Sequence, residues 1–116
     1  MEIKERKLDR IWEIQVIGRV EMIHTPELRE TVLSKINDQR HNLLLDLSKL
    51  DYINSTGLGI FIRAAKLIKE KKCHIIFCCL KENIMEIFEI AGFTKILEIH
   101  KTREEAIKAF VKDSPI

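Results

Sequence analysis

The chain has 116 residues, which predicts one domain over 1–116 with an ordered core of about 2–112. Its 20 Lys and Arg nearly balance 18 Asp and Glu, and this net charge of +2 argues against a nucleic-acid binder and against a polybasic membrane anchor. The longest stretch without Asp, Glu, Lys or Arg, 52–62, is shorter than the ~20 apolar residues of a membrane-spanning helix. The charged start of the chain has no apolar signal region, so we expect a cytoplasmic protein.

The first half of the chain predicts two strands and then a helix. Residues 2–7 are typical of a charged edge strand, and 11–17 alternate apolar with polar side chains, as in a half-buried strand. Thr25 followed by Pro26 is a favoured helix start, with Thr as the cap. Leu28, Val32 and Ile36 recur every four residues and give the helix one apolar face. The helix should end near Asn37 and Asp38.

The second half predicts strands alternating with helices. The expected strands are 43–47, 74–80 and 96–99; the expected helices run from Ser55 to about Lys72, over 82–91 and from the capping box at 102–105, with 48–55 as a loop. The tail after Lys112 is expected to fray. We therefore predict an α/β fold with a mixed, mostly parallel central sheet of about four to five strands and about four helices.

The cysteines give no sign of a disulfide framework or a metal site. There are three, Cys73, Cys78 and Cys79, and 74–80 reads as a buried strand. Neighbours on a strand point to opposite faces, so Cys78 and Cys79 should not share a metal, and they are interpreted as small core side chains in a reducing compartment. No metal and no cofactor are predicted.

One segment, at the end of a buried strand, has an unusual composition with two glycines and neighbouring hydroxyl side chains. Residues 51–59 read Asp-Tyr-Ile-Asn-Ser-Thr-Gly-Leu-Gly, and binding sites of open α/β sheets gather at that edge. Ser55 lies at the expected helix start, where its hydroxyl can cap backbone N–H groups and a phosphate would meet the positive helix end. The plain alternative is that Asn54 or Ser55 only caps the helix and the two glycines only allow close packing. The segment lacks the P-loop Lys, the dinucleotide Gly pattern and the hydrolase Gly, so we predict no enzyme.

The sequence resembles the STAS-domain family of bacterial anti-sigma factor antagonists over nearly its whole length. The family's Asp-Ser-Ser/Thr-Gly-Leu-Gly motif, which follows a strand ending in Asp-Leu, is matched by 54–59 after Leu45–Leu47. The family's Gly-x-Leu-Asp segment is matched by Gly18–Glu21, with Pro26–Leu28 at the usual distance. Residues 87–93 resemble the family's helix that ends in Ser-Gly-Leu.

The resemblance implies a STAS domain that binds an anti-sigma factor which is also a serine kinase, and so frees a sigma factor. The kinase, using ATP, would phosphorylate Ser55, with Thr56 as second choice, and a serine phosphatase would reverse this. The apolar side chains of the first loop would suit a partner surface if exposed, and the alternative is that this loop packs inward. The expected partner-binding residues lie in the two loops: Glu21, Met22, Ile23, His24, Asn54, Ser55, Thr56, Gly57, Leu58 and Gly59. A monomer or weak dimer is expected.

Two residues depart from the family pattern. Asn54 replaces the motif Asp, which removes a negative charge beside the serine, and Glu21 replaces an Asp with one methylene more. These departures keep open an alternative function, a STAS scaffold or adaptor in a signalling or transporter complex with Ser55 unmodified.

Overall fold

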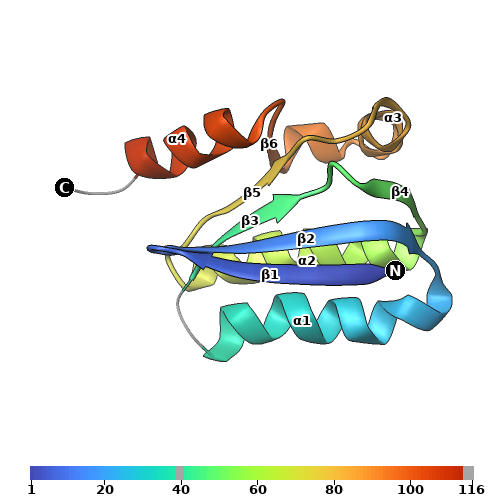
Figure 1. The fold of residues 1–116 in the computed structure, drawn as a ribbon, viewed down its shortest axis with the longest axis horizontal. Coiled ribbons are helices and arrows are strands. Elements are labelled where there is room, and N and C mark those ends of the chain that lie inside the picture. Colours follow the sequence, from blue (N-terminus) through green and yellow to red (C-terminus); the bar gives the residue numbers. More distant parts are fainter. Residues whose placement is uncertain (39–40, 114–116) are drawn as a thin grey trace.

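The computed structural model describes residues 1–38 and 41–113 and shows helices on both faces of a twisted sheet (Figure 1). The α-helices are α1 (Thr25–Asp38), α2 (Ser55–Glu70), α3 (Glu82–Ile90) and α4 (Arg103–Asp113). The strands are β1 (Glu2–Leu8), β2 (Ile11–Val20), β3 (Asn42–Asp46), β4 (Leu50–Ile53), β5 (Ile75–Cys78) and β6 (Glu98–His100). Two 3-10 turns, η1 (Met22–His24) and η2 (Phe93–Lys95), complete these elements.

The sheet has the predicted mixed, mostly parallel form. Its strand order is β1-β2-β3-β5-β6, and β4 lies off this path against β2. Only β1 is antiparallel to its neighbour; the pairs β2–β3, β2–β4, β3–β5 and β5–β6 are parallel. All strands from β2 onward therefore end at the same edge of the sheet, where binding sites of parallel sheets lie.

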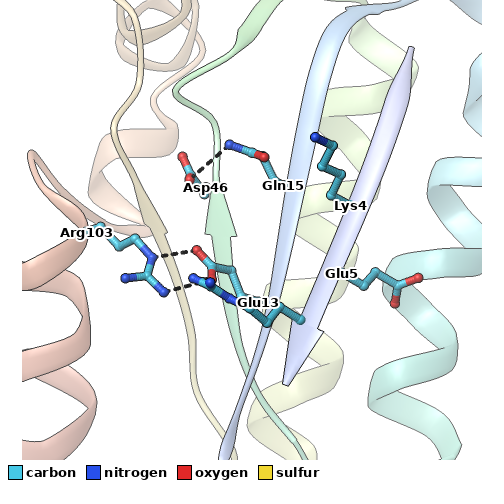
Figure 2. Close-up of a pocket in the computed structure, with 7 residues that line it drawn as sticks. Lys4, Glu5, Glu13, Gln15, Asp46 and Arg103 are labelled. Carbon is cyan, nitrogen blue, oxygen red and sulfur yellow. Dashed lines mark hydrogen bonds and ion pairs between the residues drawn. The ribbon is translucent and has the colours of Figure 1, made fainter. Parts of the chain in front are cut away.

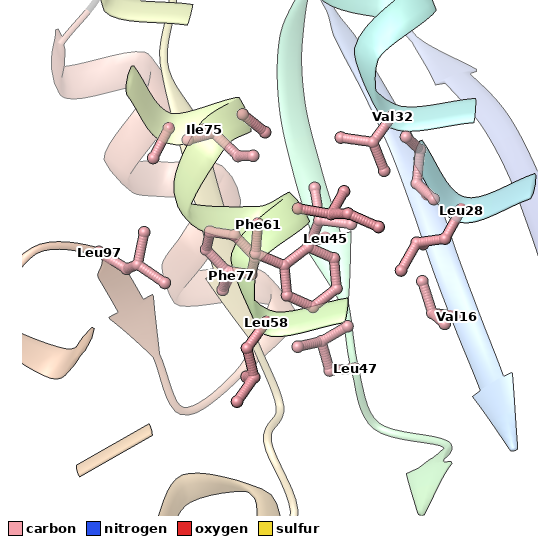
Figure 3. Close-up of a cluster of buried hydrophobic side chains, with 14 of the residues drawn as sticks. Val16, Leu28, Val32, Leu45, Leu47, Leu58, Phe61, Ile75, Phe77 and Leu97 are labelled. Carbon is pink, nitrogen blue, oxygen red and sulfur yellow. The ribbon is translucent and has the colours of Figure 1, made fainter. Parts of the chain in front are cut away.

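Two apolar clusters hold the helices to the two faces. Leu43 and Leu45 of β3 face the larger cluster with α1, α2 and α3, whereas Leu44 faces a smaller one with Ala106 and Phe110 of α4. This alternation follows from the period of two along a strand and confirms that β3 is buried on both faces. The larger cluster contains the predicted face of α1 and the edge-to-face contact of Phe77 with Phe61 (Figure 3). Phe77 makes a second edge-to-face contact, with Phe88.

The prediction of a loop over 48–55 is wrong for Leu50–Ile53, which form β4. Strand β2 pairs with β3 as far as Gln15 and then with β4 from Gly18 onward, with a register shift between Gly18 and Arg19. Gly18 has a φ of +89°, which favours glycine, and its N–H donates to the carbonyl of Lys49 at 2.8 Å. The sheet therefore has six strands rather than four or five.

Other differences concern the ends of elements. Thr25 does not cap α1: its hydroxyl donates to the Met22 carbonyl at 2.9 Å, because the turn η1 precedes the helix. The last strand begins at Glu98 rather than residue 96, since η2 occupies the connection. Helix α4 reaches Asp113, and the rest of the tail expected to fray lies outside the described residues. In the described ranges no helix has both the length and the hydropathy to cross a bilayer.

Candidate functional site

The ends of β2 and β4 bring the two predicted loops together. Val20 pairs with Ile53, and the N–H of Asn54 donates to the Val20 carbonyl at 3.1 Å. The segments that follow, η1 after β2 and the first turn of α2 after β4, therefore leave neighbouring positions at one end of the sheet (Figure 1). Residues from two distant stretches of sequence form one surface there.

The start of α2 exposes a serine beside an amide cap. Asn54 is the cap, with extended backbone, and its side-chain oxygen accepts the N–H of Gly57 at 2.8 Å. Ser55 is the first helical residue and is exposed, while Thr56 is half-buried. The cap is thus Asn54 rather than Ser55, and the Ser55 hydroxyl stands at the positive end of a 16-residue helix.

The loop after β2 presents two large apolar side chains to solvent. Met22 is 67% exposed and Ile23 is 82% exposed. A hydrogen bond holds the conformation of this turn: the Glu21 N–H donates to Nδ1 of His24 at 3.0 Å. The His24 side chain is half-buried. Glu21 itself is exposed and pairs with Arg19 at 3.4 Å. Of the two alternatives for this loop, the structure shows exposed apolar side chains rather than inward packing.

The two glycines of the motif have opposite surroundings. A Cβ on Gly57 would lie 2.7 Å from Cγ1 of Ile53 and 3.1 Å from Cγ1 of Val20, whereas a Cβ on Gly59 would meet nothing within 4 Å. Gly57 and Leu58 are buried. Both face the core in the free chain, and their role as partner contacts stays a prediction; Ser55 and Gly59 are the exposed residues of this turn.

Sequence reasoning missed a charged network on the α4 face of the sheet. Glu13 of β2 is only 6% exposed, and it accepts hydrogen bonds from Arg103 at 2.7 and 2.9 Å and from Arg6 at 3.0 Å (Figure 2). The Arg103 hydrogen bond in particular holds the pKa of the Glu13 carboxyl below its usual range. These residues line a pocket of about 450 Å³ together with Lys4, Glu5, Gln15 and Asp46. The available signal was a carboxylate in the middle of an alternating strand.

The prediction that Cys78 and Cys79 point to opposite faces is wrong. Strand β5 ends at Cys78, and Cys79 has a left-handed φ of +69°. Each of the two thiols and the Asp46 carboxylate therefore offers a ligand atom within 4.8 Å of the others. Burial is the main cause that raises the pKa of both thiols. The expectation that Cys78 is a buried core side chain is confirmed.

Comparison with known proteins identifies the family. The STAS domain family model matches residues 2–106. The chain belongs to the STAS domain family. Among curated STAS proteins, the anti-sigma-B factor antagonist of Listeria monocytogenes is 31% identical over 105 residues, which cover 90% of this chain and 91% of the relative. Membership places the chain among regulators of transcription and signalling.

Solved structures of other proteins share the fold. An anti-sigma factor antagonist from Mycobacterium paratuberculosis superimposes with a TM-score of 0.85 at 19% identity, covering 94% of this chain and 92% of the other. The phosphorylated form of the Bacillus cell fate determinant SpoIIAA superimposes with a TM-score of 0.73 at 15% identity, covering 93% and 98%. At these identities the likeness concerns the fold and supports the predicted α/β class.

Proposed function

We propose that this STAS protein is an anti-sigma factor antagonist that binds an anti-sigma factor with serine-kinase activity and is released when that kinase phosphorylates Ser55. The observation that carries the proposal is the exposed Ser55 at the first turn of α2, beside the exposed Met22 and Ile23. The names of relatives that match most of the chain support it. In this role the protein is a ligand and a substrate in the cytoplasm, with no catalysis, no cofactor and no nucleic-acid contact of its own.

The apolar side chains supply the affinity in this proposal. Met22 and Ile23 lie on a turn held by the Glu21–His24 hydrogen bond, so little ordering is needed when a partner covers them. Full burial of a Met or Ile side chain stabilises a complex by roughly 1.5–3 kcal/mol each. A contact built on two exposed apolar side chains suits a reversible complex rather than a permanent one.

The phosphate acts by charge at the centre of this surface. Phosphorylation of Ser55 adds about −1.5 to −2 charges. On the free protein this charge lies at the start of α2, where the positive end of the helix favours an anion. In the complex the same charge is covered by the partner, and burying it without a cation costs several kcal/mol, where each ~1.4 kcal/mol is tenfold in affinity. The switch therefore works without a change of fold, and a serine phosphatase resets it.

The geometry also explains what Asn54 changes. Its amide oxygen makes the cap bond to the Gly57 N–H, which is the structural task of a motif Asp, so the fold of this turn is kept. The negative charge beside Ser55 is absent. We infer that phosphorylation by the kinase is slower than with an Asp at this position, and that the helix start is unaffected.

Mass spectrometry of the protein purified from its own cells, with peptide mapping over 50–63, tests the proposal. One phosphate on Ser55 in part of the molecules is expected. Binding to the kinase should be lost in Ser55→Asp and kept in Ser55→Ala, with Thr56→Ala as the matched control that stays phosphorylated. A chain that is unmodified under all growth conditions and is not phosphorylated by its kinase with ATP contradicts the proposal and favours the scaffold function.

A further inference from the structure

A second candidate site lies on the face of the sheet that α4 covers, where β3 and β5 end. Asp46 and Cys78 are register partners on these adjacent parallel strands, and Cys79 follows directly. One ligand atom from each, a carboxylate oxygen and two sulfurs, lies within 4.8 Å of the other two. We propose that Asp46, Cys78 and Cys79 form a binding site for a thiophilic divalent cation, with Zn²⁺ as the ion that their chemistry selects.

The backbone at Cys79 is arranged for convergence of the two sulfurs. A regular strand would place its side chain opposite that of Cys78. Instead Cys79 adopts a φ of +69°, a conformation that residues other than glycine rarely take, and its N–H donates to the His100 carbonyl at 3.1 Å. Uncommon backbone conformations of this kind concentrate at ligand and functional sites.

The donor set fits Zn²⁺ better than the other common divalent ions. Ca²⁺ and Mg²⁺ require oxygen ligands, whereas Zn²⁺ takes sulfur at about 2.3 Å and carboxylate oxygen at about 2.0–2.2 Å. Tetrahedral coordination at these lengths places two sulfurs about 3.8 Å apart, so donor atoms within 4.8 Å need to converge by about 1 Å at most. Three protein ligands leave a fourth position for water.

Neighbouring groups orient the carboxylate of the proposed site. Asp46 accepts a hydrogen bond from the Gln15 amide at 3.3 Å (Figure 2) and another from the Ser48 N–H at 3.0 Å. Metal-ligating carboxylates are commonly oriented by such outer-shell partners. Two thiolates and one carboxylate around Zn²⁺ leave a charge of −1; the charged groups nearby are the Arg103 guanidinium, which is paired with Glu13, and the carboxylates of Glu13 and Glu104. Of the three proposed ligands, Asp46 lines the 450 Å³ pocket, together with Arg103.

The thiols are protonated before the ion arrives. A thiol ordinarily titrates above neutral pH, so both cysteines carry hydrogen before the ion binds. Binding forms two Zn–S bonds and releases two protons to solvent, with no change of oxidation state. Affinity should therefore rise with pH.

The test is a titration of the reduced, full-length protein with Co²⁺, followed by competition with Zn²⁺. Sulfur-to-cobalt charge-transfer absorption at one Co²⁺ per chain, quenched by Zn²⁺ with release of two protons, is expected. Cys79→Gly is the decisive variant, because glycine fits the left-handed backbone and the chain should fold at least as stably; its absorption should be absent. Cys73→Ser, at the opposite end of β5, is the control and should bind Co²⁺ like the parent. Asp46→Asn should weaken binding at least tenfold.

Two results would overturn the inference. One is a parent protein without charge-transfer absorption at millimolar Co²⁺. The other is absorption that persists in Cys79→Gly with unchanged affinity, since the thiols would then not act together.

Discussion

The two glycines of the motif allow a prediction in which stability and binding move in opposite directions. Both lie inside α2, and neither needs a left-handed backbone. A glycine in a helix interior costs about 0.8–1.0 kcal/mol relative to alanine. Gly59 incurs that cost with no internal benefit, because a Cβ there meets nothing within 4 Å.

Gly59→Ala should therefore stabilise the protein by about 0.5–1 kcal/mol. For a domain of 116 residues, this corresponds to a rise in Tm of roughly 2–5 °C. Gly57→Ala should lower Tm instead. Its methyl group would lie 2.7 Å from a side-chain carbon of Ile53, and such overpacking typically costs about 1–3 kcal/mol.

Binding should respond in the reverse sense at Gly59. Ser55 and Gly59 are four residues apart and share one face of α2. If the partner covers Ser55, it approaches the helix backbone closely at Gly59, and a methyl group there should weaken the complex tenfold or more. Thermal denaturation measures the first effect, and calorimetric titration with the kinase measures the second. An unstabilised Gly59→Ala would refute the helix argument, and a stabilised variant with unchanged Kd would remove Gly59 from the interface.

Three further predictions concern single groups. Glu13→Gln should destabilise the fold by about 2–3 kcal/mol at neutral pH, because it leaves the Arg103 guanidinium without its carboxylate partner. This guanidinium is itself only partly exposed to solvent. Because the pKa of Glu13 is lowered in the folded state, the extra stability of the parent over the variant is complete above the ordinary value of 4.5 and is lost as pH falls through the folded pKa. Urea melts of both proteins from pH 3 to 7 measure this stability difference. A difference at pH 3 equal to that at pH 7 would contradict the argument. Asn54→Ala should lower stability by about 1 kcal/mol, whereas Asn54→Asp should keep the cap and speed phosphorylation in a kinase assay; equal rates would show that the carboxylate has no part in the reaction. Phosphorylation of Ser55 should leave the circular dichroism spectrum unchanged, and a marked loss of helix signal would exclude a purely electrostatic switch.

The regular parts of the fold could be predicted because local patterns determine them. The four-residue spacing of Leu28, Val32 and Ile36 corresponds to a buried face of α1, and the run 43–47 is buried throughout. These signals depend on the period of a helix or a strand, and the same side chains that carry the period make the core. Motif matching likewise located the turn with Ser55, whose role stays a proposal.

The remaining features depend on partners distant in sequence or on backbone conformations that a pattern does not show. Glu13 reads as the polar side of a strand, and its burial depends on Arg103, 90 positions away. The letters Gly-Leu-Gly do not distinguish a glycine packed on Ile53 from one facing solvent. Adjacent cysteines on a strand should diverge, and only the left-handed φ of Cys79 brings them together.

The missed strand is also the element that assembles the candidate partner site. With a continuous β2–β3 pair and a loop over 48–55, nothing would place the turn η1 beside the start of α2. The register shift at Gly18 releases β2 from β3 and lets its last residues pair with β4, so that Val20 and Ile53 end side by side. Asn54 is then tied to Val20 by its N–H, and Gly57 packs on both strand ends. The exposed Ser55 and the exposed apolar pair Met22 and Ile23 share one surface because of this local break in the sheet, which explains why a positive-φ glycine stands at position 18.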